Sequence, residues 1–433
     1  MPKTALIINP YIFDFKLYDE WMHPTGLYFL IHYLQENGFE THYINCLERP
    51  GTARKKRYNT GDFPWTEIEK PELYNSVQRK YKMYGISPDD FKTKLSRIPS
   101  PDVICVGSMM TYWLPGVSET IRLIRCVHPK SPLVVGGIAA QLFGDYVAKS
   151  HPDIVLAHKD CEIAGIRFSN RIADQNWTPG LIAGIKAAGN VPHGPVLTSL
   201  GCPLSCSYCA SKKLQPRFTH RPPGLVSQEI HFMSDSLHIR DFAFYDDALL
   251  AKAEGSLFPL AEKLGNLKNK LRFHTPNGLH LKYLNRKVLD CLKSLNVTTL
   301  RFGYETAMNR YRNSTDGKIT SSLLQEKTAL LRATGFVRNV GIYLMAGLPE
   351  QKPEDVLEEM DQVSSCGVMV KPVFLSPVPG TPLFNVYSKQ FPQLLADPLW
   401  HNDTFFITKL PGWNSDAMEK VRKKAKELNC SLS

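Results

Sequence analysis

The sequence predicts an α/β protein with two consecutive parallel sheets: a doubly wound sheet of the Rossmann type, then a partial (β/α)6 barrel of the TIM type. Short apolar segments alternate with amphipathic helical segments along most of the chain. In the second half, each apolar segment ends in a polar or Gly/Pro turn. Alternating strands and helices indicate a parallel sheet, because each helix returns the chain to the same edge. A glycine-containing stretch at residues 163–193 is predicted to link the two sheets.

The first predicted domain covers residues 1–162 and is interrupted by a polar, aromatic insertion at 50–98. Its strands are expected at residues 4–9, 41–45, 103–108, 132–135 and 153–156. Ligands of doubly wound sheets bind beyond the carboxyl ends of the strands. The loops that follow Asn9, Ser108 and Gly137 therefore outline a candidate binding cleft.

The second predicted domain covers residues 194–385 and is followed by a C-terminal helical extension at 386–433, which includes a basic helix. Its strands are expected at residues 195–197, 241–245, 271–275, 298–303, 339–345 and 368–374. A helix follows each of the first five strands. Since barrels of this kind carry their chemistry at the carboxyl ends of the strands, the site is expected at that edge.

Three cysteines, Cys202, Cys206 and Cys209, have the spacing C-x3-C-x2-C in the turn after the first strand of the second domain. Thiolates suit iron–sulfur sites, and three of them would bind three irons of a cubane cluster and leave the fourth iron open. Zinc is an alternative, but structural zinc sites favour four ligands in close pairs, and His220 does not complete such a pattern. A disulfide is disfavoured by the expected reducing compartment.

The pattern C-x3-C-x-φ-C, with Tyr208 just before the last cysteine, resembles the signature of the radical S-adenosylmethionine (SAM) superfamily. The resemblance implies a 4Fe-4S cluster whose open iron binds the amino and carboxylate groups of SAM. It also implies that an electron from the cluster cleaves SAM to a 5′-deoxyadenosyl radical, and that Tyr208 lies against the adenine. The topology agrees, because the cysteine turn follows the first strand and so lies at the mouth of the barrel.

Several strand-end turns resemble those of the cobalamin-dependent radical SAM class, namely F-Y-D-D, P-N-G-L, F-G-Y-E-T, M-A-G-L-P-E and P-V-P-G-T-P-L-F. The resemblance implies that Asp246 or Asp247 contacts the SAM amino group and that Glu305 lies near SAM. It further implies that the turn from Gly347 to Pro349 passes the adenine. An ammonium group needs carboxylate or carbonyl partners, and a flat ring needs a close backbone free of Cβ atoms. A helix N-cap is an equally good reading of the aspartate pair.

The N-terminal domain resembles the cobalamin-binding domain of many radical SAM enzymes over about residues 1–160, with P-x-G-L at the first helix and V-V-G-G later. The resemblance implies cobalamin-binding positions at Asn9, Ser108, Met109, Tyr112, Gly136 and Gly137. Other cobalamin proteins carry D-x-H-x-x-G, in which the histidine ligates cobalt. Here Trp21 replaces the aspartate, so His23 is interpreted as a helix-entry residue. The segment 158–162 also departs from the Gly/Glu-rich turn of the relatives.

The composition is that of an ordinary globular protein, with 43% hydrophobic and 21% charged residues among 433. No apolar run reaches the roughly 20 residues that span a bilayer, and we expect a cytoplasmic protein. The net charge of +11 is spread along the chain, which favours a solvated surface over a nucleic-acid site. The expected partners are a small-molecule, lipid or peptide substrate and an electron donor such as flavodoxin or ferredoxin.

The function predicted first is a radical SAM enzyme that uses a 4Fe-4S cluster, SAM and cobalamin as a C-methyltransferase. An alternative is a radical SAM enzyme without cobalamin that performs rearrangement, cyclisation or redox chemistry. A methylthiotransferase is also considered, although such enzymes carry further cysteines near the first strand, which here ends in Asn9-Pro10-Tyr11. A non-catalytic iron–sulfur sensor is a last alternative, but it would not need the full set of strand-end turns.

Overall fold

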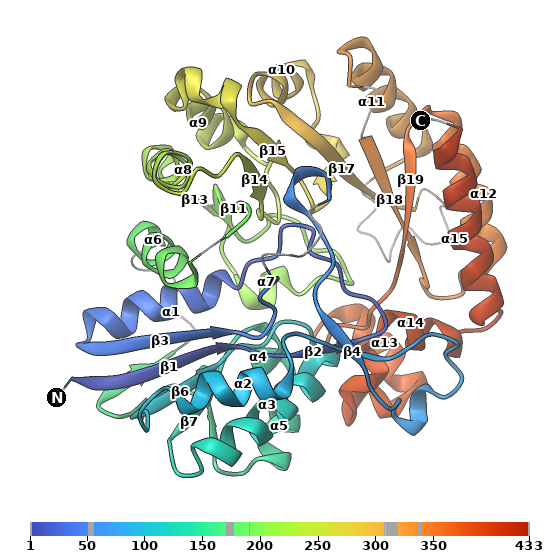
Figure 1. Cartoon of the computed structure of the whole chain (residues 1–433). Coiled ribbons are helices and arrows are strands. Elements are labelled where there is room, and N and C mark those ends of the chain that lie inside the picture. Colours follow the sequence, from blue (N-terminus) through green and yellow to red (C-terminus); the bar gives the residue numbers. More distant parts are fainter. Residues whose placement is uncertain are drawn as a thin grey trace. The chain divides into compact units, whose positions relative to one another are not determined.

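The computed structural model describes residues 2–50, 56–169, 177–189, 191–306, 308, 319–336 and 340–431. The chain divides into two units (Figure 1). Unit 1 consists of Met1–Pro192 and Pro392–His401, and unit 2 of His193–Phe391 and Asn402–Ser433. Each unit contains a parallel sheet with helices, so the predicted α/β fold class is confirmed. Residues 51–55 of the predicted insertion, 170–176 of the predicted linker and Asn339 of the fifth predicted barrel strand lie outside the described residues.

The main sheet of unit 1 has five parallel strands in the described part of the chain, in the order β3-β1-β6-β7-β8. These are β1 (Lys3–Asn9), β3 (Phe39–Asn45), β6 (Val103–Val106), β7 (Leu133–Val135) and β8 (Ile154–Leu156). The chain starts in β1, turns to β3 on one side and then crosses to β6 on the other. The sheet is therefore doubly wound, and its topological switch point lies at β1 and β6.

Two helical layers cover this sheet (Figure 1). The helices of unit 1 are α1 (Thr25–Glu36), α2 (Pro88–Ser96), α3 (Leu114–Val127), α4 (Ile138–Phe143), α5 (Asp145–Ser150) and α6 (Trp177–Ala188). Side chains alternate between the faces of a strand. Accordingly, Ala5 and Ile7 of β1 pack in one core with apolar residues of α1. Leu6 and Ile8 pack in the other core with apolar residues of α3.

The stretch 163–193, predicted as a linker, instead contains β10 (Ile166–Phe168) and helix α6, which packs on α1. A Cβ atom at Gly180 would lie 2.5 Å from a ring carbon of Phe29, and one at Gly184 would overlap Tyr28. The sequence predicts these glycines as part of a linker, but in the structure they permit close approach of two helices. Residues of this stretch therefore belong to unit 1.

The insertion predicted at 50–98 adds a small antiparallel sheet of order β2-β5-β4. Its strands are β2 (Ile12–Asp14), β4 (Trp65–Glu67) and β5 (Lys82–Tyr84). The short segment Pro392–His401, predicted within the C-terminal extension, also belongs to unit 1. There the Tyr74 hydroxyl donates to the Leu399 carbonyl at 2.8 Å, and His401 Nδ1 lies 2.9 Å from Thr111 Oγ1.

The sheet of unit 2 follows chain order, β11-β14-β15-β17-β18-β19, with β16 (Leu279–His280) beside β17. Its strands are β11 (Gly194–Val196), β14 (Asp241–Phe244), β15 (Arg272–His274), β17 (Val297–Glu305), β18 (Val340–Ala346) and β19 (Met369–Phe374). All these strands pair in parallel, and in the described residues β11 and β19 form the two edges. The six strands match the predicted ones, and the barrel is incomplete.

Helices α8 to α12 flank this sheet (Figure 1). The helices of unit 2 are α7 (Ser211–Leu214), α8 (Pro223–Ser236), α9 (Leu257–Lys263), α10 (Arg286–Ser294), α11 (Ser321–Ala333), α12 (Pro353–Ser365), α13 (Pro382–Gln390), α14 (Asp403–Phe406) and α15 (Ser415–Cys430). The basic helix α15, predicted as part of an extension, packs on β19 and α12. Its Asn429 side chain bonds both the amide and the carbonyl of Val370, which covers part of the edge strand.

A buried polar cluster joins three strands of unit 2. Asp241 accepts two hydrogen bonds from the Arg272 guanidinium, at 2.6 and 2.7 Å, and lies 3.1 Å from His274 Nε2. The other ring nitrogen of His274 lies 3.1 Å from Thr299 Oγ1. Burial alone would raise the pKa of Asp241, but hydrogen bonds from His274 and Arg272 outweigh it and lower the pKa to about 2.

We expect the stability of unit 2 to depend less on pH in the Asp241→Asn variant than in wild type. The pKa of Asp241 is about 3.9 in the unfolded chain and lower in the folded protein. Asp241 therefore stabilises the fold above about pH 4. This contribution disappears as the pH falls from about 5 to about 2. Denaturant unfolding of both proteins between these pH values measures it. Equal pH dependence of the two proteins would contradict the assignment.

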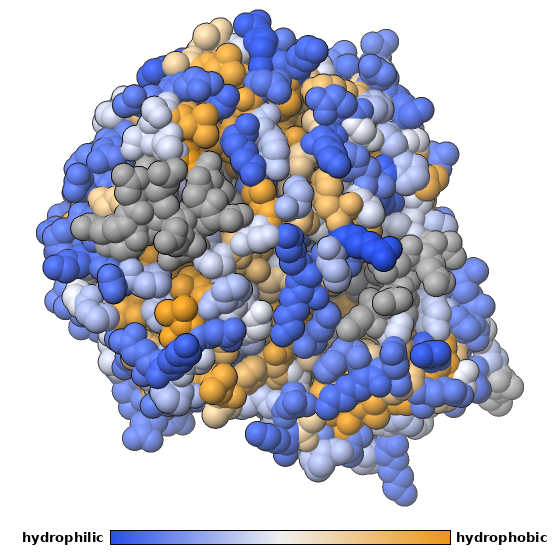
Figure 2. All heavy atoms as spheres, turned by 180° about the vertical axis from the view of Figure 1, so that it is seen from behind, coloured by the Kyte–Doolittle hydropathy of each residue, from blue (hydrophilic) through white to orange (hydrophobic). Residues whose placement is uncertain are grey.

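The described ranges contain no helix that is long and apolar enough to cross a membrane. Hydrophilic side chains predominate on the face drawn in Figure 2, and hydrophobic residues form scattered patches between them.

Candidate functional site

The three cysteines of interest lie in one closed loop of unit 2. The loop follows β11, and the short strands β12 (Ser199–Leu200) and β13 (Thr219–His220) pair in antiparallel fashion at its base. Gly201 adopts a positive φ of 74° as the loop begins, and a Cβ atom there would lie 2.7 Å from the Arg217 carbonyl oxygen. The hairpin therefore holds residues 201–218 at the carboxyl end of β11.

A buried aspartate anchors this loop to the neighbouring strand. The Asp246 carboxylate accepts hydrogen bonds from the Thr198 amide, the Thr198 hydroxyl at 2.7 Å and the Ser199 hydroxyl at 2.6 Å. Burial raises the pKa of Asp246, and the hydrogen bonds from Ser199 and Thr198 offset part of this rise. With these donors on its oxygens, Asp246 positions the loop. This role differs from both predictions made for Asp246, namely a contact to the SAM amino group and a helix N-cap.

Cys202 and Cys206 are buried, whereas Cys209 is exposed, and none of the three forms a disulfide. Backbone amides point at two of the sulfurs: the Leu204 amide lies 3.5 Å from Cys202 Sγ, and the Ser211 amide lies 3.5 Å from Cys209 Sγ. Among the described residues, no three His, Cys, Asp or Glu side chains converge as a site for one metal ion. A cubane does not require such convergence, because each cysteine binds a different iron. The donor set thus fits a cluster better than a single zinc ion.

The loop also brings together two other predicted residues, Tyr208 and Glu305. The Tyr208 side chain hydrogen-bonds to Glu305 and to Cys206. Burial and the neighbouring Glu305 carboxylate raise the pKa of Tyr208 well above its usual range, so the phenol keeps its proton and donates it. Glu305 is buried at the end of β17 and has a positive φ of 65°. The pairing of β17 with β18 shifts register at this point.

A left-handed backbone at a non-glycine residue is strained, and such strain concentrates at functional sites. The bulge directs the Glu305 carboxylate toward the cysteine loop. The order of β17, Phe302-Gly303-Tyr304-Glu305, supports this arrangement, because a Cβ atom at Gly303 would lie 2.7 Å from Glu305 Oε1. The role of Tyr208 and Glu305 toward SAM stays a prediction.

Two further polar side chains lie beside the cysteines. Asp247 is exposed, accepts a hydrogen bond from Ser211 and lies close enough to Cys202 to affect its pKa. His280 Nε2 lies 3.8 Å from Cys202 Sγ. His280 directly follows the P-N-G-L turn, but no motif in the sequence indicates a role for it. Of the adjacent aspartates, Asp247 is the one that remains accessible to a ligand.

The side chain of Gln351 holds the turn from Gly347 to Pro349. No motif in the sequence indicates this role for Gln351. The Gln351 side chain accepts from the Gly347 and Leu348 amides at 2.8 and 3.1 Å, and donates to the Met345 carbonyl at 3.1 Å. Gly347 has a φ of 100°, and a Cβ atom there would contact Leu375, Ile407 and Leu410. The backbone conformation and the packing both favour glycine at this position, and the passage of this turn past the adenine of SAM stays a prediction.

In unit 1, the predicted strand-end residues meet at the carboxyl edge of the sheet. The Ser108 hydroxyl donates to the Gly136 carbonyl at 2.7 Å and accepts from the Ala140 amide at 2.9 Å. Gly137 has a φ of 95°, and a Cβ atom there would overlap the Ser108 backbone. Asn9 Nδ2 donates to Asn45 Oδ1 at 2.8 Å. The ends of β1, β3, β6 and β7 are therefore joined by hydrogen bonds.

Other predicted cobalamin positions differ in exposure. The Met109 side chain is 46% exposed. Ile138, which directly follows Gly137, is 42% exposed. Tyr112, in contrast, packs in a buried apolar cluster with Trp113 and is only 7% exposed, so its assignment to a ligand surface is corrected. His23 is buried, and its Nδ1 lies 3.1 Å from the Tyr28 hydroxyl, as expected for a helix-entry residue.

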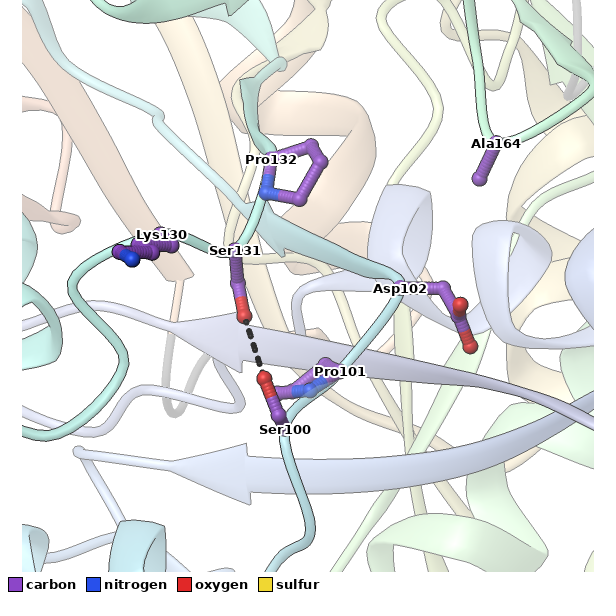
Figure 3. Close-up of a pocket in the computed structure, with 7 residues that line it drawn as sticks. All are labelled: Ser100, Pro101, Asp102, Lys130, Ser131, Pro132 and Ala164. Carbon is purple, nitrogen blue, oxygen red and sulfur yellow. Dashed lines mark hydrogen bonds between the residues drawn. The ribbon is translucent and has the colours of Figure 1, made fainter.

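A shallow cavity of about 400 Å³ lies at the opposite edge of this sheet (Figure 3). Its lining residues are Ser100, Pro101, Asp102, Lys130, Ser131, Pro132 and Ala164. All of them except Ala164 directly precede β6 or β7, and Asp102 accepts a hydrogen bond from the Thr4 amide at 2.7 Å. Since the cavity lies at the amino ends of these strands, it is not part of the predicted cofactor edge.

Residues 196–363 match the family model of the radical SAM superfamily. This part of the chain belongs to the radical SAM superfamily. The matched segment includes the cysteine loop, the aspartate pair, Glu305 and the turn at Gly347, and it ends before β19. The chain is a radical SAM enzyme, and membership implies a 4Fe-4S cluster and SAM as cofactors.

Two curated relatives of the chain are distant in sequence. The uncharacterized methyltransferase PH0819 of Pyrococcus horikoshii is 25% identical over 244 residues, which are 55% of this chain and 51% of the relative. The chain thus spans about half the length of this relative. The tRNA-2-methylthio-N(6)-dimethylallyladenosine synthase of Corynebacterium glutamicum is 21% identical over 383 residues, which are 80% of this chain and 71% of the relative.

The fold extends over nearly the whole chain of a solved radical SAM methyltransferase, TsrM from Kitasatospora setae. Its structure with tryptophan substrate and a SAM analogue has a TM-score of 0.65 and 15% identity, and covers 98% of this chain and 89% of TsrM. A structure of the same enzyme with cobalamin and a [4Fe-4S] cluster has a TM-score of 0.64, 14% identity, and coverage of 99% and 89%. At this identity the likeness establishes the fold, including the predicted N-terminal parallel sheet.

Proposed function

We propose that this radical SAM enzyme is a cobalamin-dependent C-methyltransferase. The observation that carries the proposal is the fold that it shares over nearly its whole length with TsrM, a methyltransferase solved with cobalamin and a cluster. The match to the methyltransferase PH0819 adds support. The residues at the strand ends of each unit fit the required cofactors.

Cys202, Cys206 and Cys209 would hold the cluster, which supplies the electron for reductive cleavage of SAM when both are bound. Asp247 is the accessible carboxylate beside Cys202 and suits the ammonium group of SAM. Tyr208 is fixed by its hydrogen bonds to Glu305 and Cys206, and so offers one preorganised ring beside the cysteines. These residues orient SAM without a large rearrangement of the loop, because Asp246 holds the loop at its base.

In unit 1, the exposed side chains of Met109 and Ile138 follow two loop residues that contact each other, Ser108 and Gly137. Exposed apolar residues at the carboxyl edge of a doubly wound sheet are suited to a flat, largely apolar ligand. We assign this edge to cobalamin, with His23 held by Tyr28 inside the unit and not on the metal.

A double substitution, Met109→Glu with Ile138→Glu, tests the cobalamin assignment. Both positions are exposed, so folding should persist, while two carboxylates on the apolar edge should weaken corrin binding about 10-fold or more. Spectroscopic titration with hydroxocobalamin measures the affinity. Leu395→Glu is the matched control, because Leu395 is also an exposed apolar residue of unit 1, at 63%. Equal affinities in wild type and double variant would contradict the assignment.

The methyl-transfer proposal is tested by the products formed from SAM. A C-methyltransferase of this kind consumes SAM both as a methyl donor and as a source of radicals, and should yield S-adenosylhomocysteine together with 5′-deoxyadenosine. Chromatography of reactions with and without added cobalamin measures both products. Production of 5′-deoxyadenosine alone, regardless of cobalamin, would overturn the proposal in favour of a corrin-free radical SAM enzyme.

A further inference from the structure

We propose that His280 is a positioning residue of the cysteine loop, which donates a hydrogen bond to the Cys202 sulfur and thereby makes a bound cluster easier to reduce. The inference rests on the proposed function, since it concerns the cluster that the cysteines would hold. Three features of unit 2 support it: the contact between the two side chains, the strand that holds His280, and the apolar surroundings of Cys202.

The first feature is the contact itself. His280 Nε2 lies 3.8 Å from Cys202 Sγ, a distance within the range of a hydrogen bond to sulfur. A cysteine that binds iron does so as a thiolate, so its sulfur has no proton to donate and can only accept. The Nε2 atom therefore carries the proton of this bond. The Leu204 amide lies 3.5 Å from the same sulfur, so that a backbone donor and a side-chain donor both act on Cys202.

The second feature is the strand that carries His280. Strand β16 pairs in parallel with β17, where His280 is the register partner of Gly303. The residues on either side of it, Leu279 and Leu281, are buried and fix the backbone at both ends. The imidazole also contacts the Tyr283 ring edge-on, with 6.1 Å between the ring centroids. The donor is thus held beside the cysteine loop by an element outside the loop.

The third feature is the apolar environment of Cys202. Its buried side chain packs in a cluster with Ala248, Ala251, Leu204, Phe218 and Tyr283. Reduction adds a negative charge to a cluster, and hydrogen bonds to the cysteine sulfurs and exposure to water help to set its potential. Little water reaches this sulfur, and a hydrogen bond is stronger in such a low-dielectric environment. The Asp247 carboxylate also acts on Cys202, but its negative charge opposes reduction.

The other two cysteines have polar side-chain partners that belong to the loop itself. The Tyr208 side chain hydrogen-bonds to Cys206, and Ser211 Oγ lies 3.1 Å from Cys209 Sγ. These partners lie within two residues of the cysteines that they contact, so they move with the loop. His280 differs from them because its contact joins the loop to the β-sheet. It therefore both fixes the position of the loop and acts on the charge of the site.

The experiment compares wild type with His280→Phe and His280→Gln after reconstitution of the cluster, in the absence of SAM. Phenylalanine keeps an aromatic ring without a donor, whereas glutamine keeps an N–H group. Titration with dithionite, followed by electron paramagnetic resonance, measures the midpoint potential. We expect the equilibrium constant for reduction to fall about 10-fold in His280→Phe, which is about 59 mV for one electron, and to be largely restored in His280→Gln. His231→Phe, which replaces an exposed histidine of α8, is the matched control and should titrate as wild type does.

A second measurement leaves the wild-type side chain in place. Protein produced with ¹⁵N-labelled histidine is reduced, and pulsed electron paramagnetic resonance should detect a weak ¹⁵N coupling, transferred through the hydrogen bond, that disappears in His280→Gln. An unchanged potential in His280→Phe with normal iron content, or no histidine coupling in wild type, would overturn the inference. If His280→Phe loses its iron, the coupling in wild type decides. A wild-type protein that forms no cluster would instead contradict the proposed function.

Discussion

The Cys206→Ala variant is expected to form 5′-deoxyadenosine from SAM at least about 100-fold more slowly than wild type. Cys206 is buried in a loop that β12, β13 and Asp246 hold in place, so no other thiol of the described residues can replace it without moving the loop. The variant removes only a sulfur atom from a side chain, and its folding should persist. Chromatography of anaerobic reactions measures the product, and iron analysis measures the cluster.

The matched control for this prediction is Cys126→Ala. Cys126 is an exposed free thiol on α3 of unit 1, and its removal should leave iron content and activity unchanged. Thermal unfolding of both variants separates loss of the cluster from loss of the fold. Undiminished SAM cleavage by Cys206→Ala would contradict the assignment of the loop.

We expect the second large effect from substitution of the adjacent aspartates. Asp246→Ala should lower stability and iron content, whereas Asp247→Ala should weaken SAM binding and leave both of these unchanged. Asp246→Ala leaves the Thr198 amide and the Thr198 and Ser199 hydroxyls without their acceptor. Loss of this buried acceptor should destabilise unit 2 by about 3 kcal/mol and release the cysteine loop, so that the iron content falls. Denaturant unfolding and iron analysis measure the two effects.

Asp247→Ala is both the control and the complementary prediction. Asp247 is exposed, so its removal should change stability little and leave the iron content intact. Loss of its carboxylate should weaken SAM binding about 10-fold, because an ammonium group loses a charged partner. Equilibrium binding of SAM to the reconstituted protein measures this effect. If Asp246→Ala binds iron normally while Asp247→Ala does not, the roles assigned to the two residues are wrong.

Most of the fold could be predicted from the sequence, because apolar strands and amphipathic helices leave strong periodic patterns. The strands of both parallel sheets and their order in the chain were predicted in this way. The failures have local causes. Gly180 and Gly184 were assigned to a linker, since the sequence alone does not distinguish a flexible glycine from one under a neighbouring helix. The packing of α15 on β19 depends on contacts between distant segments, and no periodicity encodes these.

The site could be predicted where spacing determines the chemistry, as for the three cysteines. It could not be resolved where neighbouring residues of one type face different surroundings. Asp246 and Asp247 are one residue apart, but one is buried by the cysteine loop and the other is exposed. Gln351 and His280 belong to the site through hydrogen bonds made after folding. Tyr112 carries an aromatic ring suited to a ligand or a core, and only the fold shows that it lies in the core.

The most direct test of the account is an anaerobic absorption spectrum combined with iron, sulfide and corrin analysis of protein produced with cobalamin. We expect iron–sulfur absorption, about four irons and four sulfides per chain, and about one corrin per chain. Iron–sulfur absorption without corrin, even after reconstitution with cobalamin, would contradict the proposed methyl transfer.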